Sequence, residues 1–270
     1  MLSPKRSPIK IEPPVSGTEK VLADFDEIKR ACVLWGENLL RMKENNAPTG
    51  FTWYGYDILS NIWHIDALLD SAHRDFFARI QNMPIADIGA ADGDLAFFFE
   101  HLGFEVDVID WPSTNWNGMR GVRALKELLD AGAWIHEIDL DSQFRLPRSD
   151  YGFVFLLGIL YHLKNPFYVM EQLARATRYC VLSTRVARRT VDGGVSLDKA
   201  PLAYLLAPDE CNNDATNYWI FSLPGLLRLA ERTGWRVLAC RTVGDTAQSD
   251  PSSIDHDERA FLLLESVGGS

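Results

Sequence analysis

The sequence lacks the features that identify several common classes of protein. Its four cysteines are scattered without a CxxC pair, and its histidines are not spaced as zinc ligands, so neither a metal site nor a disulfide framework is predicted. No apolar run approaches the ~20 residues of a membrane-spanning helix, and residues 1–17 hold no apolar secretory signal. We therefore expect a cytoplasmic protein with reduced thiols and no membrane partner.

Positive charge is also scarce. Lys and Arg number 27 against 37 Asp and Glu, which gives a net charge of −10. A field of that sign repels phosphate backbones, so broad nucleic-acid binding is disfavoured. A local exception is the basic cluster of Arg185, Arg188 and Arg189. These arginines either bind a phosphate or carboxylate group of a substrate, or they belong to a solvated loop without such a role.

The 270 residues suffice for one large domain with an appendage. Apolar residues recur at helical spacing in two early stretches, and the aromatic-rich turn between them, at 47–57, is either core packing or a lid over a ligand. We predict a flexible tail at 1–17, a helical appendage at 18–80 with helices at 21–42 and 57–80, and a main domain at 81–270.

In the main domain, short apolar runs alternate with helical or turn-rich segments. Such runs are typical of a parallel sheet covered by helices on both faces. An insertion without clear periodicity follows at 186–219, then a helix between an N-cap at Ser222 and a stop at Gly234, then two strands that must pair antiparallel. The five earlier strands are predicted at 84–88, 104–109, 133–138, 152–157 and 179–184.

This order of elements resembles the class I methyltransferase fold, which binds S-adenosylmethionine. The resemblance implies an α/β, Rossmann-like sheet of seven mostly parallel strands, with the antiparallel last strand between its predecessor and the rest of the sheet.

The loop after the first strand reads GAADGD and departs from the GxGxxG of dinucleotide-binding folds. Asp94 stands at the third glycine position and Asp92 lies in the same turn. Carboxylates beside a pyrophosphate cost roughly 1–4 kcal/mol per close pair at surface-like dielectrics. A nicotinamide oxidoreductase is therefore disfavoured.

S-adenosylmethionine has no phosphate and carries an ammonium, a sulfonium and a ribose diol, which suit acidic neighbours. Asp87 can face the ammonium, while Asp110 is placed for the ribose hydroxyls or is a solvated strand end. Asp139 is placed for the adenine amino group, with Asp141 as a rival and ordinary turn chemistry as the alternative. The predicted cofactor-binding residues are Asp87, Gly89, Ala90, Gly93, Asp110, Trp111, Asp139, Leu140 and Leu157.

The phrase LLGILYHLKNP at 156–166 resembles the family of transfer-RNA wobble-uridine methyltransferases, as does the segment NYWIFSLPGLLRLAERTGWRVL. The resemblance implies that Tyr161 and His162 lie near the transferred group. His162 is either a general base or a structural residue bonded to a backbone carbonyl. The loop departs from the family's usual small-glycine pair. No equivalent can be placed for the basic residues that carboxymethyl-transferring members need, so plain methyl transfer is expected.

We accordingly predict an S-adenosylmethionine-dependent methyltransferase acting on a small molecule or nucleoside by in-line transfer. Transfer to tRNA and a non-catalytic S-adenosylmethionine-binding subunit are the alternatives. The insertion and the 53–56 turn are expected to roof the acceptor pocket.

Overall fold

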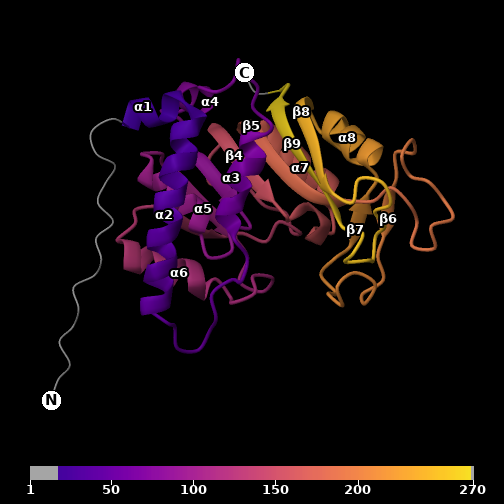
Figure 1. Cartoon of the computed structure of the whole chain (residues 1–270), viewed down its shortest axis with the longest axis horizontal. Helices are drawn as coiled ribbons and strands as arrows, with labels where there is room; N and C mark the ends of the chain where they lie inside the picture. The colour runs from indigo at the N-terminus through magenta and orange to yellow at the C-terminus, as the bar shows by residue number, and fades with distance from the viewer. Residues whose placement is uncertain (1–17, 269–270) are drawn as a thin grey trace.

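The computed structural model describes residues 18–268, and the predicted tail at 1–17 lies outside the described residues. The strands form one mixed sheet (Figure 1). They are β1 (Ile85–Ile88), β2 (Val106–Asp110), β3 (Trp134–Glu137), β4 (Tyr151–Leu157), β5 (Thr177–Val186), β6 (Ala203–Leu205), β7 (Trp219–Phe221), β8 (Trp235–Gly244) and β9 (Glu258–Ser266).

The sheet has the predicted strand order. Strands β3, β2, β1, β4 and β5 are neighbours in that order and run parallel. The last strand, β9, pairs antiparallel with β5 on one side and with β8 on the other. The antiparallel final strand between its predecessor and the parallel strands is therefore confirmed, as is the fold class.

The predicted count of seven strands was wrong, because the sheet has nine strands within residues 18–268. The two additional strands, β6 and β7, come from the insertion. Strand β4 last pairs with β5 at Leu157 and Ser183, and β7 pairs with β5 farther along, at Val186 and Phe221. Three-residue strands are too short to show an alternating pattern, so no local signal predicted them.

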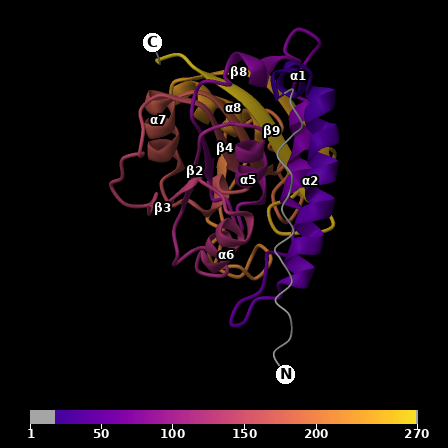
Figure 2. The ribbon, with the colours of Figure 1, turned by 90° about the vertical axis from the view of Figure 1, so that its left-hand side faces the viewer.

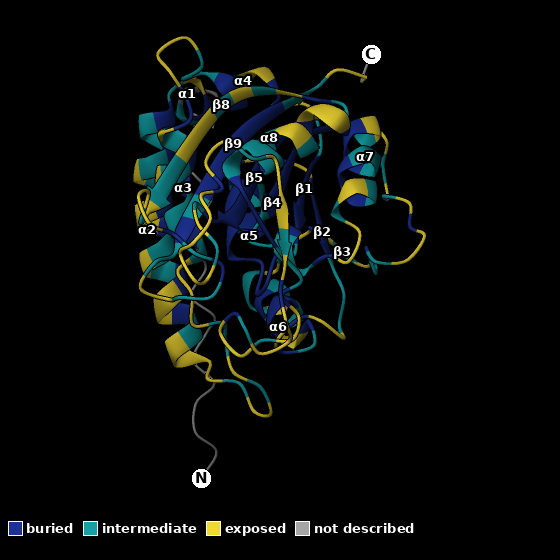
Figure 3. Cartoon of the chain, turned by 90° about the vertical axis from the view of Figure 1, so that its right-hand side faces the viewer, coloured by how far each residue is buried: buried dark blue, intermediate teal, exposed yellow. Residues whose placement is uncertain are grey.

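Helices cover both faces of the sheet. They are α1 (Thr18–Ala23), α2 (Phe25–Asn45), α3 (Asn61–Asp66), α4 (Phe76–Arg79), α5 (Asp94–His101), α6 (Arg120–Leu129), α7 (Pro166–Ala176) and α8 (Leu223–Arg232), with the 3-10 turns η1 (Ile58–Ser60) and η2 (Leu160–His162). Helices α2 to α6 share one hydrophobic core with one face, while α7 and α8 share a second core with the other. Figure 2 shows α2 along one side and α7 on the opposite side. The central strands between the layers are buried (Figure 3).

Helix α2 forms where the apolar spacing predicts it. Asp24 caps its start by accepting a hydrogen bond from the Asp26 N–H. One face of the helix is buried, through Phe25, Ile28, Cys32, Trp35, Leu39 and Met42. The last turn of the helix reaches the loop at 89–94, which is called the glycine-rich loop below.

The predicted second helix at 57–80 is divided into η1, α3 and α4. The chain turns after α3, where the Asp70 side chain accepts a hydrogen bond from the Ala72 N–H and competes with helical pairing. Phe76 and Phe77 then enter the core, where both rings contact Phe153 of β4. A continuous helix was therefore a wrong prediction. In contrast, α8 begins after the predicted cap, with Ser222 Oγ accepting from the Gly225 N–H.

Candidate active site

The glycine-rich loop leaves β1 at the carboxyl edge of the sheet and leads into α5. Gly89 and Gly93 have φ of +71° and +84°, a region that suits glycine. A Cβ at Gly89 would lie 2.1 Å from Cδ1 of Ile159, so the backbone passes directly against the loop that follows β4. Ala90 is buried, and Ala91 adopts a φ of +56° without being glycine. The loop is therefore held in one tight conformation.

Asp87 is a buried carboxylate at the end of β1. Its Oδ2 is buried and has no hydrogen-bond partner within residues 18–268. Burial, and secondarily the charge of Asp110, raise the pKa of Asp87 to about 7. Such a group is poised to gain a cationic partner from a ligand.

Lys43 at the end of α2 was missed by the sequence analysis. Its Nζ lies 2.6 Å from Oδ1 of Asp94 and 3.2 Å from Oδ2 of Asp92, and its side chain is only 11% exposed. Burial raises the pKa of Asp94, and Lys43 opposes that shift. The two loop carboxylates are thus compensated by a lysine 49 and 51 residues away in the sequence, which no local pattern could indicate.

Asp92 also binds the aromatic-rich turn. Its Oδ2 accepts a hydrogen bond of 2.7 Å from the Tyr54 N–H, and its Oδ1 accepts one of 2.8 Å from Asn117. The Trp116 N–H donates to the Tyr54 hydroxyl oxygen at 2.7 Å. The turn therefore lies directly on the glycine-rich loop, although whether it opens and closes as a lid stays a prediction.

Asp110 ends β2 next to this loop. One carboxylate oxygen accepts from the Trp111 N–H at 2.7 Å, and the other accepts from the Asn115 side chain at 2.8 Å. Burial raises the pKa of Asp110. The Ala91 N–H also interacts with this carboxylate, which offers about four acceptor sites in all, so acceptor capacity remains for a diol.

The other predicted cofactor residues follow β3 and end β4. Asp139 is half-buried and accepts a hydrogen bond from the Asp141 N–H, which is the turn geometry that the alternative interpretation expected. Asp141 in turn accepts from the Lys164 N–H. Leu140 is buried and Leu157 is half-buried. Their proposed contacts with adenine stay predictions.

Tyr161 and His162 lie in η2, after β4. Their rings are 4.3 Å apart, and the Arg259 guanidinium lies 5.9 Å from the Tyr161 ring. His162 Nδ1 lies 3.1 Å from the Thr216 carbonyl oxygen and 3.0 Å from its hydroxyl oxygen. Burial lowers the pKa of His162. A neutral imidazole at this position has the protonation state that a base requires.

Two of the three predicted substrate-binding arginines are occupied by internal partners. The buried Arg185 Nε lies 2.8 Å from Oδ1 of Asp257. Arg188 donates two hydrogen bonds, of 2.8 and 2.6 Å, to the fully buried Glu258. Arg189 is exposed, and its side chain has no ion-pair partner in the described part of the chain. Of the cluster, Arg189 alone presents an uncompensated guanidinium.

Arg259 of β9 is the second residue that the sequence analysis missed. It is half-buried, faces Tyr161, and makes no ion pair with any residue in 18–268. Its Nη1 would lie 3.5 Å from a Cβ at Gly158. The antiparallel pairing of β9 brings Arg259 opposite Arg185 at the carboxyl edge. The available signal was a cation at the start of a strand that continues as an apolar run, ERAFLLL.

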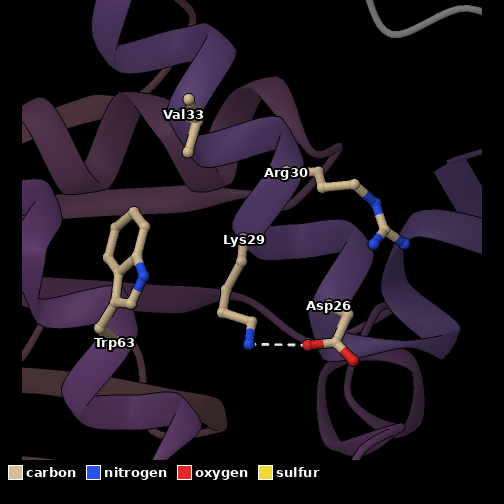
Figure 4. Close-up of a pocket in the computed structure, with 5 residues that line it drawn as sticks. All are labelled: Asp26, Lys29, Arg30, Val33 and Trp63. Carbon is tan, nitrogen blue, oxygen red and sulfur yellow. Dashed lines mark ion pairs between the residues drawn. The ribbon is translucent and has the colours of Figure 1, made fainter.

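A surface hollow of about 290 Å³ lies between α2 and α3, away from these residues (Figure 4). Asp26, Lys29 and Val33 line it, and Lys29 is paired with Asp26 at 2.7 Å. Lys43 lies at least ten residues farther along the helix, roughly 15 Å away at 1.5 Å per residue. A second hollow, of about 340 Å³, adjoins the site between Phe51, Trp116 and Arg120.

Neither a metal-binding cluster nor a membrane-spanning helix is found among the described residues. No group of three or more His, Cys, Asp or Glu in 18–268 could hold a metal ion. No helix in that range is both long and apolar enough to cross a membrane.

Comparisons with known proteins bear on both the fold and the predicted family resemblance. No protein-family model matches the sequence. The tRNA U34 carboxymethyltransferase of Pasteurella multocida is 25% identical over 142 residues, which are 52% of this chain and 41% of that protein. The matched residues therefore span less than half of the curated relative's length. The predicted resemblance to wobble-uridine methyltransferases is confirmed as a resemblance.

Solved structures confirm the fold. The N-terminal domain of EvdMO1, crystallised in the presence of SAH and D-fucose, has a TM-score of 0.54 at 16% identity, covering 85% of this chain and 96% of that domain. An S-adenosylmethionine-dependent methyltransferase from Mesorhizobium loti has a TM-score of 0.52 at 12% identity, covering 76% and 97%. The chain has the Rossmann-like fold of class I S-adenosylmethionine-dependent methyltransferases.

Proposed function

We propose that this protein is an S-adenosylmethionine-dependent methyltransferase acting on a small molecule or nucleoside. The observation that carries the proposal is the buried carboxylate of Asp87 beside the glycine-rich loop, whose Oδ2 has no hydrogen-bond partner among residues 18–268. Asp110 follows one strand later with acceptor capacity left for a diol. The helix start that would bind a pyrophosphate is instead occupied by Asp94 and Lys43.

These residues fit the cofactor, which when bound supplies a methyl group on a good leaving group. Asp87 would hold its ammonium, directly or through water, and Asp110 would hold its ribose hydroxyls. Trp111 would cover the adenine, with Asp139, Leu140 and Leu157 around it. Tyr161 would position the acceptor, and His162 would take a proton from an acceptor that must lose one.

We expect the acceptor to carry an anionic group. Arg259 and Arg189 lie near this edge, and neither guanidinium has a carboxylate partner within residues 18–268. Their role as anion ligands replaces that of Arg185 and Arg188 in our proposal, because those two side chains are paired internally. Charge-assisted hydrogen bonds from a guanidinium suit phosphate or carboxylate.

A second candidate is carboxymethyl transfer to tRNA. The name of the Pasteurella multocida relative favours it. Arg259 also favours it, because a cation beside Tyr161 could hold an additional carboxylate on the cofactor. The net charge of −10 argues against a broad tRNA-binding surface.

An acceptor screen tests the proposal. Methyl-labelled S-adenosylmethionine would be incubated with nucleosides, small phenols and amines, and bulk tRNA, and incorporated label would be counted. We expect label in a low-molecular-weight acceptor, and much less label with the Asp110→Ala variant at the same cofactor concentration. Incorporation only from carboxy-S-adenosylmethionine into tRNA would favour the second candidate. Tight cofactor binding without any incorporation would indicate a non-catalytic binding subunit.

A further inference from the structure

Three side chains form a continuous hydrogen-bonded row from the insertion to η2. Asp214 Oδ1 accepts a hydrogen bond of 2.6 Å from the Thr216 hydroxyl and one of 2.9 Å from the Thr216 N–H. The Thr216 hydroxyl oxygen lies 3.0 Å from Nδ1 of His162, and the Thr216 carbonyl oxygen lies 3.1 Å from the same nitrogen. The row therefore ends on the imidazole that our proposed function uses as a base.

The chemistry of these partners fixes which nitrogen carries the proton. A carbonyl oxygen can only accept, so Nδ1 must donate to it. The Thr216 hydroxyl uses its hydrogen to donate a hydrogen bond to the Asp214 carboxylate. Its oxygen therefore acts as an acceptor toward Nδ1. Both contacts require a proton on Nδ1, which leaves the lone pair of neutral His162 on Nε2. Nε2 has no hydrogen-bond partner in the described part of the chain.

The insertion is attached to η2 on both sides of this row. The Tyr218 N–H donates to the Tyr161 carbonyl oxygen at 2.8 Å, and the Trp219 indole N–H donates to the Leu163 carbonyl oxygen at 3.1 Å. Trp219 begins β7, which is joined to β5 at the sheet edge. Thr216 is thereby held at a fixed place relative to His162.

We propose that Asp214 and Thr216 are positioning residues that hold His162 in the tautomer with Nε2 free to accept the acceptor's proton. This inference rests on the proposed methyl transfer. As the acceptor oxygen or nitrogen forms its bond to the methyl carbon, the carbon–sulfur bond breaks and its electron pair stays on sulfur. The acceptor's proton passes to Nε2. The resulting imidazolium keeps its Nδ1–H bonded to Thr216, and the Asp214 carboxylate stabilises its charge.

The charges around His162 define the expected pH dependence. Asp214 of the insertion favours the imidazolium, whereas burial and Arg259 of β9 disfavour it. The Tyr161 ring packs beside the imidazole. Removing the Asp214 charge must therefore lower the pKa of His162.

Nitrogen NMR of the full chain labelled in histidine tests this without any acceptor. The His162 resonances would be assigned with His162→Gln, and their shifts report the tautomer and the pKa. We expect the Nδ1-protonated tautomer in the native protein and a fall of about 0.5–1 unit in the pKa of His162 in Asp214→Asn. Thr216→Ser should keep the native tautomer, whereas Thr216→Val should keep only the carbonyl contact and shift the tautomer equilibrium.

Asp209→Asn is the matched control, because Asp209 is an exposed acid of the same insertion and makes no hydrogen bond within residues 18–268. It should leave the His162 titration unchanged. A native protein with the proton on Nε2, or equal His162 pKa values in native protein and Asp214→Asn, would overturn the proposal. Because these spectra need no turnover, a failed acceptor screen and a failed positioning role are told apart.

Discussion

Asp87 shows how one buried carboxylate links ligand binding to stability. Its pKa in the folded chain is about 7, while an unfolded chain would have the ordinary value near 3.9. A raised pKa in the folded state means that stability is greatest below the unfolded value and is lost as the pH rises through about 7. Near neutral pH the site therefore favours any ligand that brings a cation to Asp87.

We predict that Asp87→Asn stabilises the ligand-free protein in alkaline solution, because the amide removes a buried charge. Between pH 5 and pH 8 its stability relative to the native chain should rise by about 2–3 kcal/mol, at 1.36 kcal/mol per pH unit. Urea unfolding at the two pH values measures this difference. The same variant should bind S-adenosylmethionine about tenfold to hundredfold more weakly. A stability difference that is the same at both pH values would contradict the assigned pKa.

Lys43 is predicted to be a structural ion-pair partner for the glycine-rich loop. Lys43→Met leaves Asp92 and Asp94 buried without their cation, so it should cost about 3 kcal/mol in unfolding free energy at pH 7. Arg41→Met is the control on the same helix, since Arg41 pairs with Glu37 where both side chains are largely exposed. It should cost less than about 0.5 kcal/mol. Equal effects of the two substitutions would show that Lys43 is not buried with the loop.

At the scale of elements, the ion pair of Arg188 with Glu258 joins the end of β5 to the start of β9. Glu258 is fully buried and also accepts a hydrogen bond of 2.7 Å from Ser249. Arg188→Met should therefore destabilise the protein by about 3 kcal/mol in chemical unfolding. Arg189→Met, one residue on and exposed, should leave stability within about 0.5 kcal/mol. If Arg188→Met has the same unfolding free energy as the native chain, the ion pair does not stabilise the contact between β5 and β9.

The elements that sequence patterns predicted are those with local signals. The five parallel strands, the Ser222 cap and the final hairpin each follow from apolar runs, a capping residue or the lack of a connecting helix. The break in the helix at 57–80 and the short strands β6 and β7 could not be predicted from local patterns. Tertiary packing and pairing with neighbouring strands determine them.

The same distinction between local signals and tertiary contacts applies to the candidate site. The positions of Asp87 and Asp110 at the sheet edge could be predicted from motif spacing, and that of the LYH phrase from its resemblance to a known family. The Lys43 contacts, the pairing of Arg185 with Asp257 and the row from Asp214 to His162 could not, because each joins residues far apart in the chain. Sequence predicted which groups lie at the sheet edge, but not which charges are already neutralised there.

At the scale of the whole molecule, the carboxyl edge of the sheet gathers the site from distant parts of the chain. The glycine-rich loop, the aromatic-rich turn, η2, the insertion and the start of β9 all meet there through the contacts described above. The chain carries a net charge of −10, and acidic residues lie at or just after the carboxyl ends of β1, β2 and β3. This arrangement suits a cofactor without phosphate that carries positive charge.

Calorimetric titration at pH 7.5 with S-adenosylmethionine, S-adenosylhomocysteine and NAD tests that claim most directly. We predict that the two sulfur ligands bind competitively at one site and that NAD binds far more weakly than either. Asp110→Ala should weaken both sulfur ligands by about 1–3 kcal/mol, the scale of a lost charge-assisted hydrogen bond. Tighter binding of NAD than of either sulfur ligand, or sulfur-ligand affinities unchanged by Asp110→Ala, would contradict the proposed site.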